Sequence, residues 1–171
     1  MILVRHAESE WNHHFSRTRI DPGIPDPSLT RAGRRQAAQL VDRLAEAEVK
    51  RLVASPYRRT LETATIVGNA LGLSITVEPL IRERCVFSCD EGTPPAQLAA
   101  LWPDLGFAHL DERWWGVAAE SEVSLGERCA AFRAKTDALA DRSQIAVITH
   151  WGVIRALTGQ ELTNAASIRL D

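Results

Sequence analysis

Short apolar runs alternate with longer amphipathic stretches along this chain, and the alternation restricts its possible folds more than any other feature. Strand-type runs occupy residues 1–4, 51–55, 74–77 and 144–149, with a short fifth run at 167–170. Apolar residues at helical spacing predict helices over residues 29–48, 57–71, 94–102, 122–139 and 153–158. Strands that alternate with helices predict an α/β fold: a three-layer α/β/α sandwich around a mainly parallel central sheet.

Length and composition fit one such domain. The 171 residues and an apolar content of 45% predict a single domain over residues 1–171 with a complete hydrophobic core. The net charge of −2 argues against nucleic acid or an anionic membrane as a partner. No apolar stretch approaches the ~18–20 residues that a membrane span requires. Three cysteines without a secretory signal favour a reduced, cytoplasmic protein.

Two segments show no regular periodicity. Residues 12–28 are polar and rich in proline, and much of 83–124 has the same character. Irregular stretches of this length in a compact domain are usually functional or disordered. Trp102, Trp114 and Trp115 lie in the second segment and favour an ordered cover over the domain. We expect the two segments to form the surfaces that determine specificity.

Three of the predicted strands end in residues that suit an anionic ligand. Arg5 and His6 follow the first strand in "LVRHAESEWN", Arg58 and Arg59 follow the second in "ASPYRRTLETA", and His150 follows the fourth in "AVITHWGVIRALTG". Open α/β sheets bind ligands at the carboxyl ends of their strands. Two imidazoles and at least two guanidiniums at one sheet edge form a pocket for a phosphate dianion, because its oxygens need several donors and a balancing positive charge.

These stretches, with "LIRERC" between them, resemble the histidine phosphatase (phosphoglycerate mutase-like) superfamily in their order and over nearly the whole chain. The "THWG" sequence around the second histidine is similar to a small bacterial-type branch of that superfamily. The chain has Ala7 where the family usually has glycine after Arg-His, and Trp151 where many members have glycine. We expect these two departures to affect substrate choice rather than the phosphohistidine chemistry.

The resemblance implies a role for each matching residue. His6 would attack phosphorus and become phosphohistidine, which a neutral imidazole can do near neutral pH. His150, a catalytic residue in this scheme, would donate to the phosphoryl oxygens, and Glu83 would protonate the leaving oxygen and later activate water. By the same resemblance, Arg5, Asn12 and Arg59 would bind the substrate. No metal and no cofactor is implied, since arginine and histidine supply the charge.

Some assignments have alternatives. Arg59 is preferred to Arg58 because the family's arginine falls four residues after the serine of its motif, and helix geometry could reverse the choice. Asp90 or Glu91 could donate the proton in place of Glu83. Cys85 and Cys89 lack partners at zinc-site spacing. His13, His14 and His109 are interpreted as surface residues.

The leading interpretation is a metal-independent phosphomonoesterase that acts on a small phosphorylated substrate. A mutase of the same family is the nearest alternative, although the chain is shorter than typical mutases and lacks obvious segments for a carboxylated sugar acid, which favours hydrolysis. A phosphate-binding module without turnover is a second alternative, and a metallohydrolase a third. The cover segments contain no pattern that selects a sugar, nucleotide or protein substrate, and no pattern indicates the oligomeric state.

Overall fold

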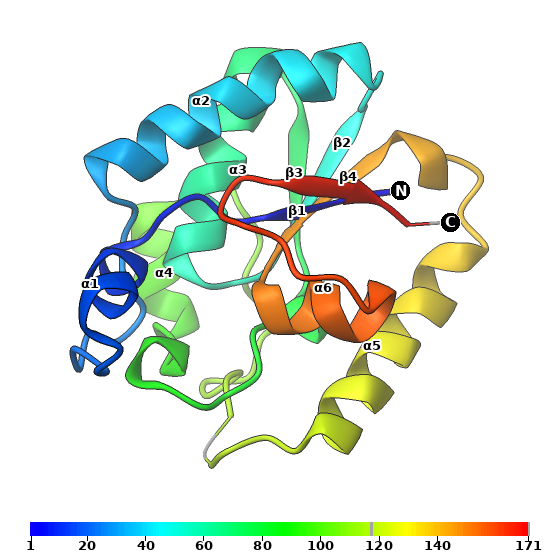
Figure 1. Ribbon diagram of the computed structural model, residues 1–171. Helices are drawn as coiled ribbons and strands as arrows, with labels where there is room; N and C mark the ends of the chain where they lie inside the picture. The colour runs from blue at the N-terminus through cyan, green and yellow to red at the C-terminus, as the bar shows by residue number, and fades with distance from the viewer. Residues whose placement is uncertain (117, 171) are drawn as a thin grey trace.

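A five-stranded sheet forms the centre of the computed structural model, which describes residues 1–116 and 118–170 (Figure 1). Its strands lie in the order β3-β2-β4-β1-β5. They comprise β1 (Ile2–Arg5), β2 (Arg51–Ala54), β3 (Ser74–Val77), β4 (Ile145–Thr149) and β5 (Ser167–Arg169). The first four strands are mutually parallel, and β5 is antiparallel to β1. The mainly parallel sheet expected from the sequence is confirmed.

Helices connect the strands, and all except α1 lie where the apolar spacing predicts them. They comprise α1 (Glu10–Thr18), α2 (Arg31–Glu46), α3 (Arg58–Leu71), α4 (Pro95–Leu101), α5 (Glu122–Asp137) and α6 (Trp151–Thr158), with 3₁₀ turns η1 (Pro79–Ile81), η2 (Ser88–Asp90) and η3 (Arg142–Gln144). The N-terminus of α2 is capped by Thr30, whose hydroxyl accepts a hydrogen bond from the Gly33 N–H at 2.9 Å. Gly72 ends α3 in the left-handed region with φ of 66°.

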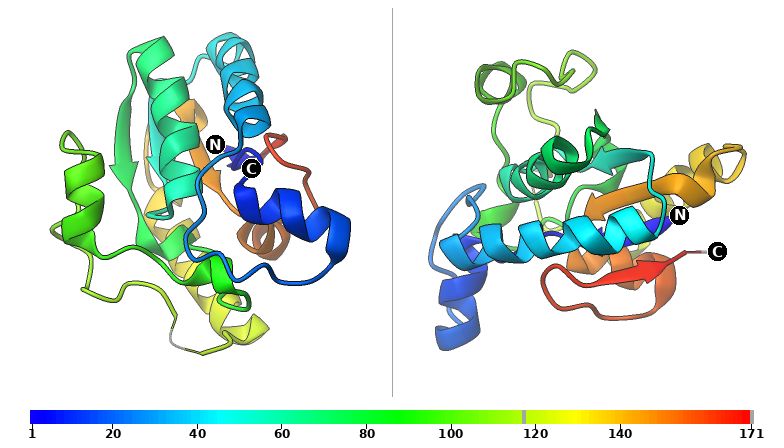
Figure 2. Two further views of the ribbon diagram at one scale, coloured as in Figure 1. Left: turned by 90° about the vertical axis from the view of Figure 1, so that its left-hand side faces the viewer. Right: turned by 90° about the horizontal axis from the view of Figure 1, so that it is seen from above.

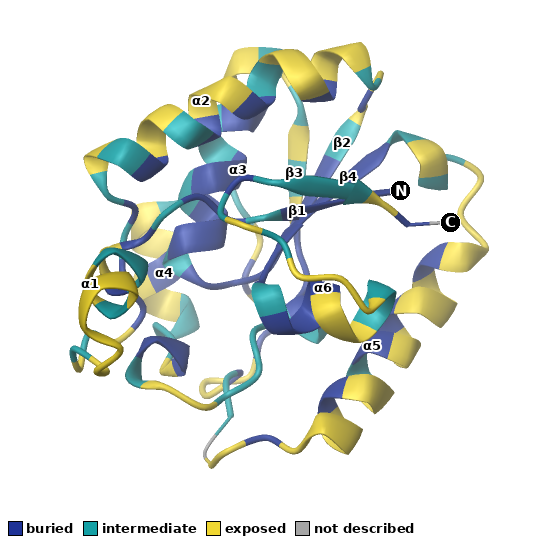
Figure 3. Ribbon diagram, in the orientation of Figure 1, coloured by how far each residue is buried: buried dark blue, intermediate teal, exposed yellow. Residues whose placement is uncertain are grey.

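The two faces of the sheet are covered by different helices, as Figure 2 shows. Ile2 and Val4 of β1 belong to an apolar cluster that includes the inner faces of α2 and α3. Leu3, between them in sequence, belongs to a second cluster with α5 and α6. Successive strand residues point to opposite faces, so a continuously apolar strand needs cover on both sides. The predicted three-layer α/β/α sandwich is therefore confirmed, and Figure 3 shows its buried interior.

The expectation that residues 12–28 are irregular is wrong for the first part of that segment, because α1 extends to Thr18. A capping box starts this helix: the Ser9 hydroxyl accepts from the Asn12 N–H, and the Asn12 side chain accepts from the Ser9 N–H. Trp11 and Phe15, one turn apart, stack with ring centroids separated by 4.4 Å. Because α1 is short and polar and is stabilised by its cap and one aromatic pair, its sequence shows little of the apolar periodicity that predicts a helix.

The carboxyl ends of β1, β2 and β4 lie together in the middle of the sheet. Arg5 pairs with Thr149 and Ala54 with Ile148, so the next residues, His6, Ser55 and His150, emerge at one edge. Within the described residues, no helix combines the length and apolar character needed to cross a bilayer.

Candidate active site

A cavity of about 760 Å³ opens at this sheet edge. Five of the six predicted site residues line it, namely Arg5, His6, Asn12, Arg59 and Glu83. The sixth, His150, is fully buried beside them, and its ring centroid lies 5.2 Å from that of His6. Elements far apart in the sequence thus bring both histidines, two arginines and a carboxyl group to one place.

His6 is held as a neutral imidazole in a defined tautomer. Its Nδ1 lies 2.8 Å from the Ala7 carbonyl oxygen, which can only accept, so Nδ1 carries the proton and Nε2 keeps a free lone pair. Burial lowers the pKa of His6 well below its usual value, and the positive charges of Arg59 and Arg5 lower it further. The Cβ of Ala7, where glycine is usual in the family, is fully buried without a positive φ.

His150 is fixed from the neighbouring strand end. Its Nε2 lies 2.8 Å from the hydroxyl oxygen of Ser55, the residue that follows β2. Its Nδ1 is buried and, within the described part of the chain, has no hydrogen-bond partner. Burial, followed by the charge of Arg59, lowers the pKa of His150 well below its usual value. A buried ring nitrogen without a partner costs free energy and favours a ligand that can pair with it.

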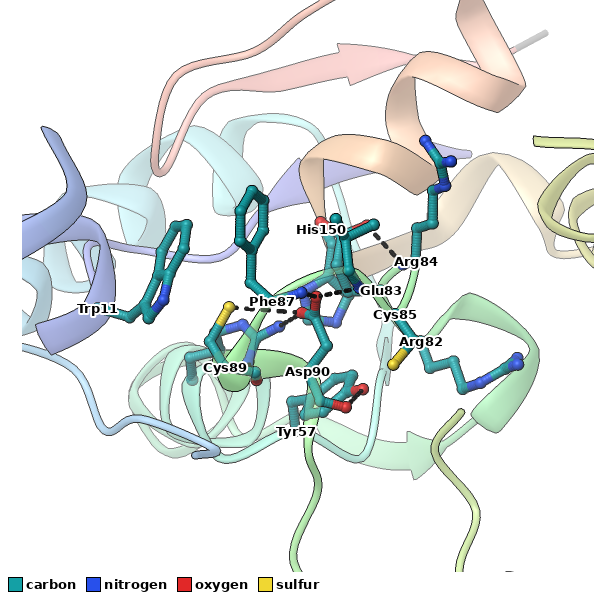
Figure 4. A network of polar contacts seen from close by, with 12 residues as sticks. Trp11, Tyr57, Arg82, Glu83, Arg84, Cys85, Phe87, Cys89, Asp90 and His150 are labelled. Carbon is teal, nitrogen blue, oxygen red and sulfur yellow. Dashed lines mark hydrogen bonds and ion pairs between the residues drawn. The ribbon is translucent and has the colours of Figure 1, made fainter. Parts of the chain in front are cut away.

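Arg59, rather than Arg58, faces the cavity, in agreement with the motif spacing. Its guanidinium donates to the Cys89 carbonyl at 2.7 Å and to the Asp90 carboxylate at 3.2 Å, and it lies 4.3 Å from the centroid of the Tyr57 ring. Figure 4 shows Asp90, Tyr57 and Cys89 gathered in this network. Arg58, the first residue of α3, does not line the cavity; its backbone N–H donates to Asp26 and its guanidinium to the Ser28 hydroxyl.

Arg5 and Asn12 present donors on the other side of His6. One terminal nitrogen of Arg5 donates to the Leu162 carbonyl at 2.7 Å, while its buried Nε has no described partner. The Asn12 Oδ1 accepts from Ser9 and from the Asn164 amide nitrogen at 3.2 Å. No described residue accepts from the Asn12 Nδ2, which leaves that N–H group for a ligand in the cavity.

Glu83 is a carboxyl group whose proton affinity suits acid catalysis. Burial raises its pKa to about 6, and the negative charge of Asp90 adds to the effect. Its oxygens accept from the Gly152 N–H at 3.1 and 3.3 Å and from the Arg84 N–H at 2.9 Å. A Cβ on residue 152 would lie only 2.5 Å from the Glu83 Oε1, so glycine is required for this approach.

The alternative proton donors occupy other roles. Asp90 is buried, and beyond its pair with Arg59 its carboxylate accepts from the N–H groups of Val86 and Phe87, each at 3.0 Å. Glu91 is exposed and does not line the cavity. Glu83 therefore remains the carboxyl group best placed to exchange a proton with a ligand.

The other histidines lie outside the cavity, and of the cysteines Cys89 lines it. His14 and His109 are exposed, and His13 is partly exposed beside Glu8. Among the described residues, no cluster of three histidine, cysteine, aspartate or glutamate side chains has the geometry of a metal site. The three cysteines are free thiols.

Comparisons with known proteins show the family of the chain. The sequence model of the histidine phosphatase superfamily (branch 1) matches residues 1–168. The chain belongs to that superfamily.

Relatives within the superfamily carry two kinds of name. A glucosyl-3-phosphoglycerate phosphatase of Mycolicibacterium vanbaalenii is 28% identical over 173 residues, which cover 92% of this chain and 72% of that protein. A probable phosphoglycerate mutase GpmB of an Enterobacter species is 38% identical over 83 residues, which cover 48% of this chain and 37% of that protein. The solved mycobacterial glucosyl-3-phosphoglycerate phosphatase with VO3 superposes with a TM-score of 0.69 at 22% identity, covering 98% and 88% of the two chains, and shows the same fold.

Several groups that shape this superfamily site are missed by sequence reasoning. They are the Ser55 hydroxyl beside His150, the Gly152 N–H on Glu83, and the carboxylate of Asp90 that holds Arg59. Ser55 ends a strand and Gly152 begins a helix, so their positions in the motifs offered a signal. The pairing of Arg59 with Asp90 joins residues 31 apart and has no local signature.

Proposed function

We propose that this chain hydrolyses phosphomonoesters through a phosphohistidine formed on His6, without a metal ion, acting on small phosphorylated substrates. The observation that carries the proposal is the neutral His6 with its Nε2 lone pair free, in one cavity with Arg5, Arg59 and the raised-pKa carboxyl of Glu83. A nucleophile, an acid and the charges that balance a phosphate dianion then act together. The names of the relatives support the same chemistry.

In the first step, the Nε2 of His6 attacks phosphorus and forms an N–P bond while the bond from phosphorus to the ester oxygen breaks. Glu83 gives its proton to the departing oxygen, which leaves as an alcohol. The guanidiniums of Arg5 and Arg59, the Asn12 Nδ2 and the Nδ1 of His150 donate to the phosphoryl oxygens. Because the Ser55 hydroxyl can donate to the Nε2 of His150, the Nδ1 of a neutral His150 can carry the required proton.

In the second step, Glu83 acts as a base, as the reverse of its first role requires. It takes a proton from a water molecule that attacks phosphorus, the N–P bond breaks, and inorganic phosphate and neutral His6 are regenerated. The carboxyl returns to its protonated form ready for another cycle. A pKa of about 6 lets Glu83 serve in both directions near neutral pH.

Trapping the intermediate tests this proposal. Wild-type protein is mixed with a phosphomonoester in the presence of a chelator, quenched, and examined by intact mass for an acid-labile, base-resistant phosphoryl group. We expect the group in wild-type protein and in His14→Ala, whose side chain is exposed and outside the cavity. We expect neither the group nor turnover in His6→Ala. A fully active His6→Ala protein would eliminate the assignment of the nucleophile.

The same experiment separates the alternative functions. A mutase would return the phosphoryl group to an acceptor, so product isomerisation that depends on a bisphosphorylated primer would exceed phosphate release. A binding module would retain affinity for phosphorylated ligands and show no turnover on any ester. Loss of activity in chelator, restored by one divalent ion, would favour a metallohydrolase.

The free thiols favour the reducing cytoplasm as the place of action.

A further inference from the structure

One side of the cavity is built from aromatic rings that the proposed phosphate chemistry does not use. Trp11 and Phe15 of α1 and Phe87, which precedes η2, form a three-ring cluster that we term the aromatic wall. The ring centroid of Phe87 lies 5.0 Å from that of Trp11 and 5.3 Å from that of Phe15. Figure 4 shows Phe87 between Trp11 and the labelled group around Glu83 and His150.

Hydrogen bonds to one carboxylate hold the aromatic wall in place. The Asp21 carboxylate accepts from the indole N–H of Trp11 at 2.9 Å and from the Ser88 backbone N–H at 2.8 Å, and it also accepts from the Ser88 hydroxyl. Asp21 thereby joins the segment after α1 to the segment that carries Phe87. These hydrogen bonds fix the orientation of the rings before a ligand arrives, which lowers the entropy lost on binding.

The wall remains partly open to the cavity. Phe87 is 41% exposed and its neighbour Val86 is 50% exposed, although both line the cavity. Large apolar side chains gathered at the mouth of a cleft are typical of a ligand-binding surface. A phosphate group occupies only a small part of about 760 Å³, so the remaining volume suits an organic group.

The cations near the cavity mouth are poorly disposed to bind a second anion. Arg84 pairs with Glu122, and Arg155 lies 3.9 Å from both Glu122 and Glu161. Arg19 is the exception, and its guanidinium lies 5.8 Å from the centroid of the Phe15 ring. A planar guanidinium stacked over an aromatic ring extends the surface of the aromatic wall and is compatible with an aromatic ligand.

We propose that the aromatic wall is the subsite for the leaving group, and that the substrates are phosphomonoesters of aromatic or bulky apolar alcohols. The inference rests on the proposed function, since the ester phosphate must sit at His6. Glu83 protonates the leaving oxygen, and Phe87 lies four residues further along the same segment. Glu83 and the rings of the aromatic wall line the same cavity, so the apolar part of an alcohol that receives the proton from Glu83 can contact these rings.

The test compares benzyl phosphate with ethyl phosphate. Both release a primary alcohol, so their difference in kcat/KM measures contact with the organic group rather than ease of departure. We expect benzyl phosphate to be preferred by about tenfold or more, in keeping with the burial of one aromatic ring. Equal rates, or a preference for 3-phosphoglycerate that is lost in Arg19→Ala, would overturn the inference and leave the phosphatase proposal intact.

Variants locate the preference. Phe87→Ala should lower the benzyl-to-ethyl ratio about tenfold, whereas Phe87→Leu should keep most of it because an apolar side chain remains. Leu101→Ala is the matched control, since Leu101 is 55% exposed and does not line this cavity. An unchanged benzyl-to-ethyl ratio in Phe87→Ala, whether or not both rates fall, would show that Phe87 has only a structural role and would overturn the inference.

Binding of non-hydrolysable phosphonates separates the inference from the proposed function. We expect benzylphosphonate to bind about tenfold more tightly than methylphosphonate in calorimetry, and Phe87→Ala to abolish the difference. This result without turnover of any ester would retain the subsite and reject hydrolysis. Turnover with equal affinities for the two phosphonates would retain hydrolysis and reject the subsite.

Discussion

Replacing Gly152 by alanine should disable the proton donor while leaving the nucleophile and the fold in place. The new Cβ would lie 2.5 Å from the Glu83 Oε1, whereas ordinary contact begins near 3.4 Å. The clashing atom belongs to the flexible end of the Glu83 side chain, so the carboxyl group can move away by about 0.9 Å at little cost in folding free energy. A displacement of about 1 Å at a reacting group lowers rates by about 10²-fold.

The loss should depend on the leaving group. Ethyl phosphate, whose alkoxide needs a proton to depart, should lose about 10²-fold in kcat/KM, while 4-nitrophenyl phosphate should lose only a few-fold. The hydrogen bond from the Gly152 N–H lowers the pKa of Glu83, so weakening it should also move the alkaline limb of the pH profile upward. Steady-state kinetics on both esters between pH 4.5 and 8.5 would measure the two effects.

A matched glycine on another helix provides the control. Gly126 of α5 has open space where a Cβ would be added, so Gly126→Ala should leave both esters unaffected. The melting temperature of Gly152→Ala should stay within about 2–4 °C of wild type, the shift expected for ~1 kcal/mol in a domain of this size. Wild-type rates on ethyl phosphate, or equal losses on the two esters, would refute the assigned role of Glu83.

Three further outcomes are expected. Glu83→Gln should slow ethyl phosphate about 10²-fold or more and 4-nitrophenyl phosphate much less, and equal losses would indicate another acid. For wild-type protein, kcat/KM should fall above pH about 6 as Glu83 loses its proton, and it should also fall at low pH as His6 and His150 become protonated. In a pH series, Glu83→Gln should remove only the decline at high pH. Asp90→Asn should lower the free energy of unfolding in urea by roughly 3–5 kcal/mol, because the buried guanidinium of Arg59 loses its charged partner. Inorganic phosphate, by binding the folded state, should restore part of this loss. A decrease below about 1 kcal/mol would contradict this account.

Protonation also links these groups to stability. Folding raises the pKa of Glu83 from 4.5 to about 6, so the folded state binds this proton more tightly and the associated stability is lost as the pH rises through that window. The lowered pKa of His6 acts oppositely, since the folded state resists protonation and stability falls as the pH drops below 6.5. Because His150 is shifted in the same direction as His6, the two histidines outweigh Glu83, and the net contribution of these groups to stability should rise as the pH rises through the mildly acidic range.

The sequence by itself determined the layered α/β fold and half of the site. Strand residues such as Leu3 and Val4 are apolar on both faces, and parallel strands place their carboxyl ends together, so Arg5, His6 and His150 had to meet. These conclusions need only the period of the backbone and the position of each residue at the end of its strand.

Only the tertiary structure decided the remaining contacts. The bond between Glu83 and the Gly152 N–H joins residues 69 apart, and the pair of Arg59 and Asp90 joins residues 31 apart. The raised pKa of Glu83 depends on its burial and on neighbouring charges, and neither is encoded in local periodicity. The helix α1 is stabilised locally by its capping box and by the stacked rings of Trp11 and Phe15, whereas the aromatic wall also depends on Phe87, which packs against them from a distant segment.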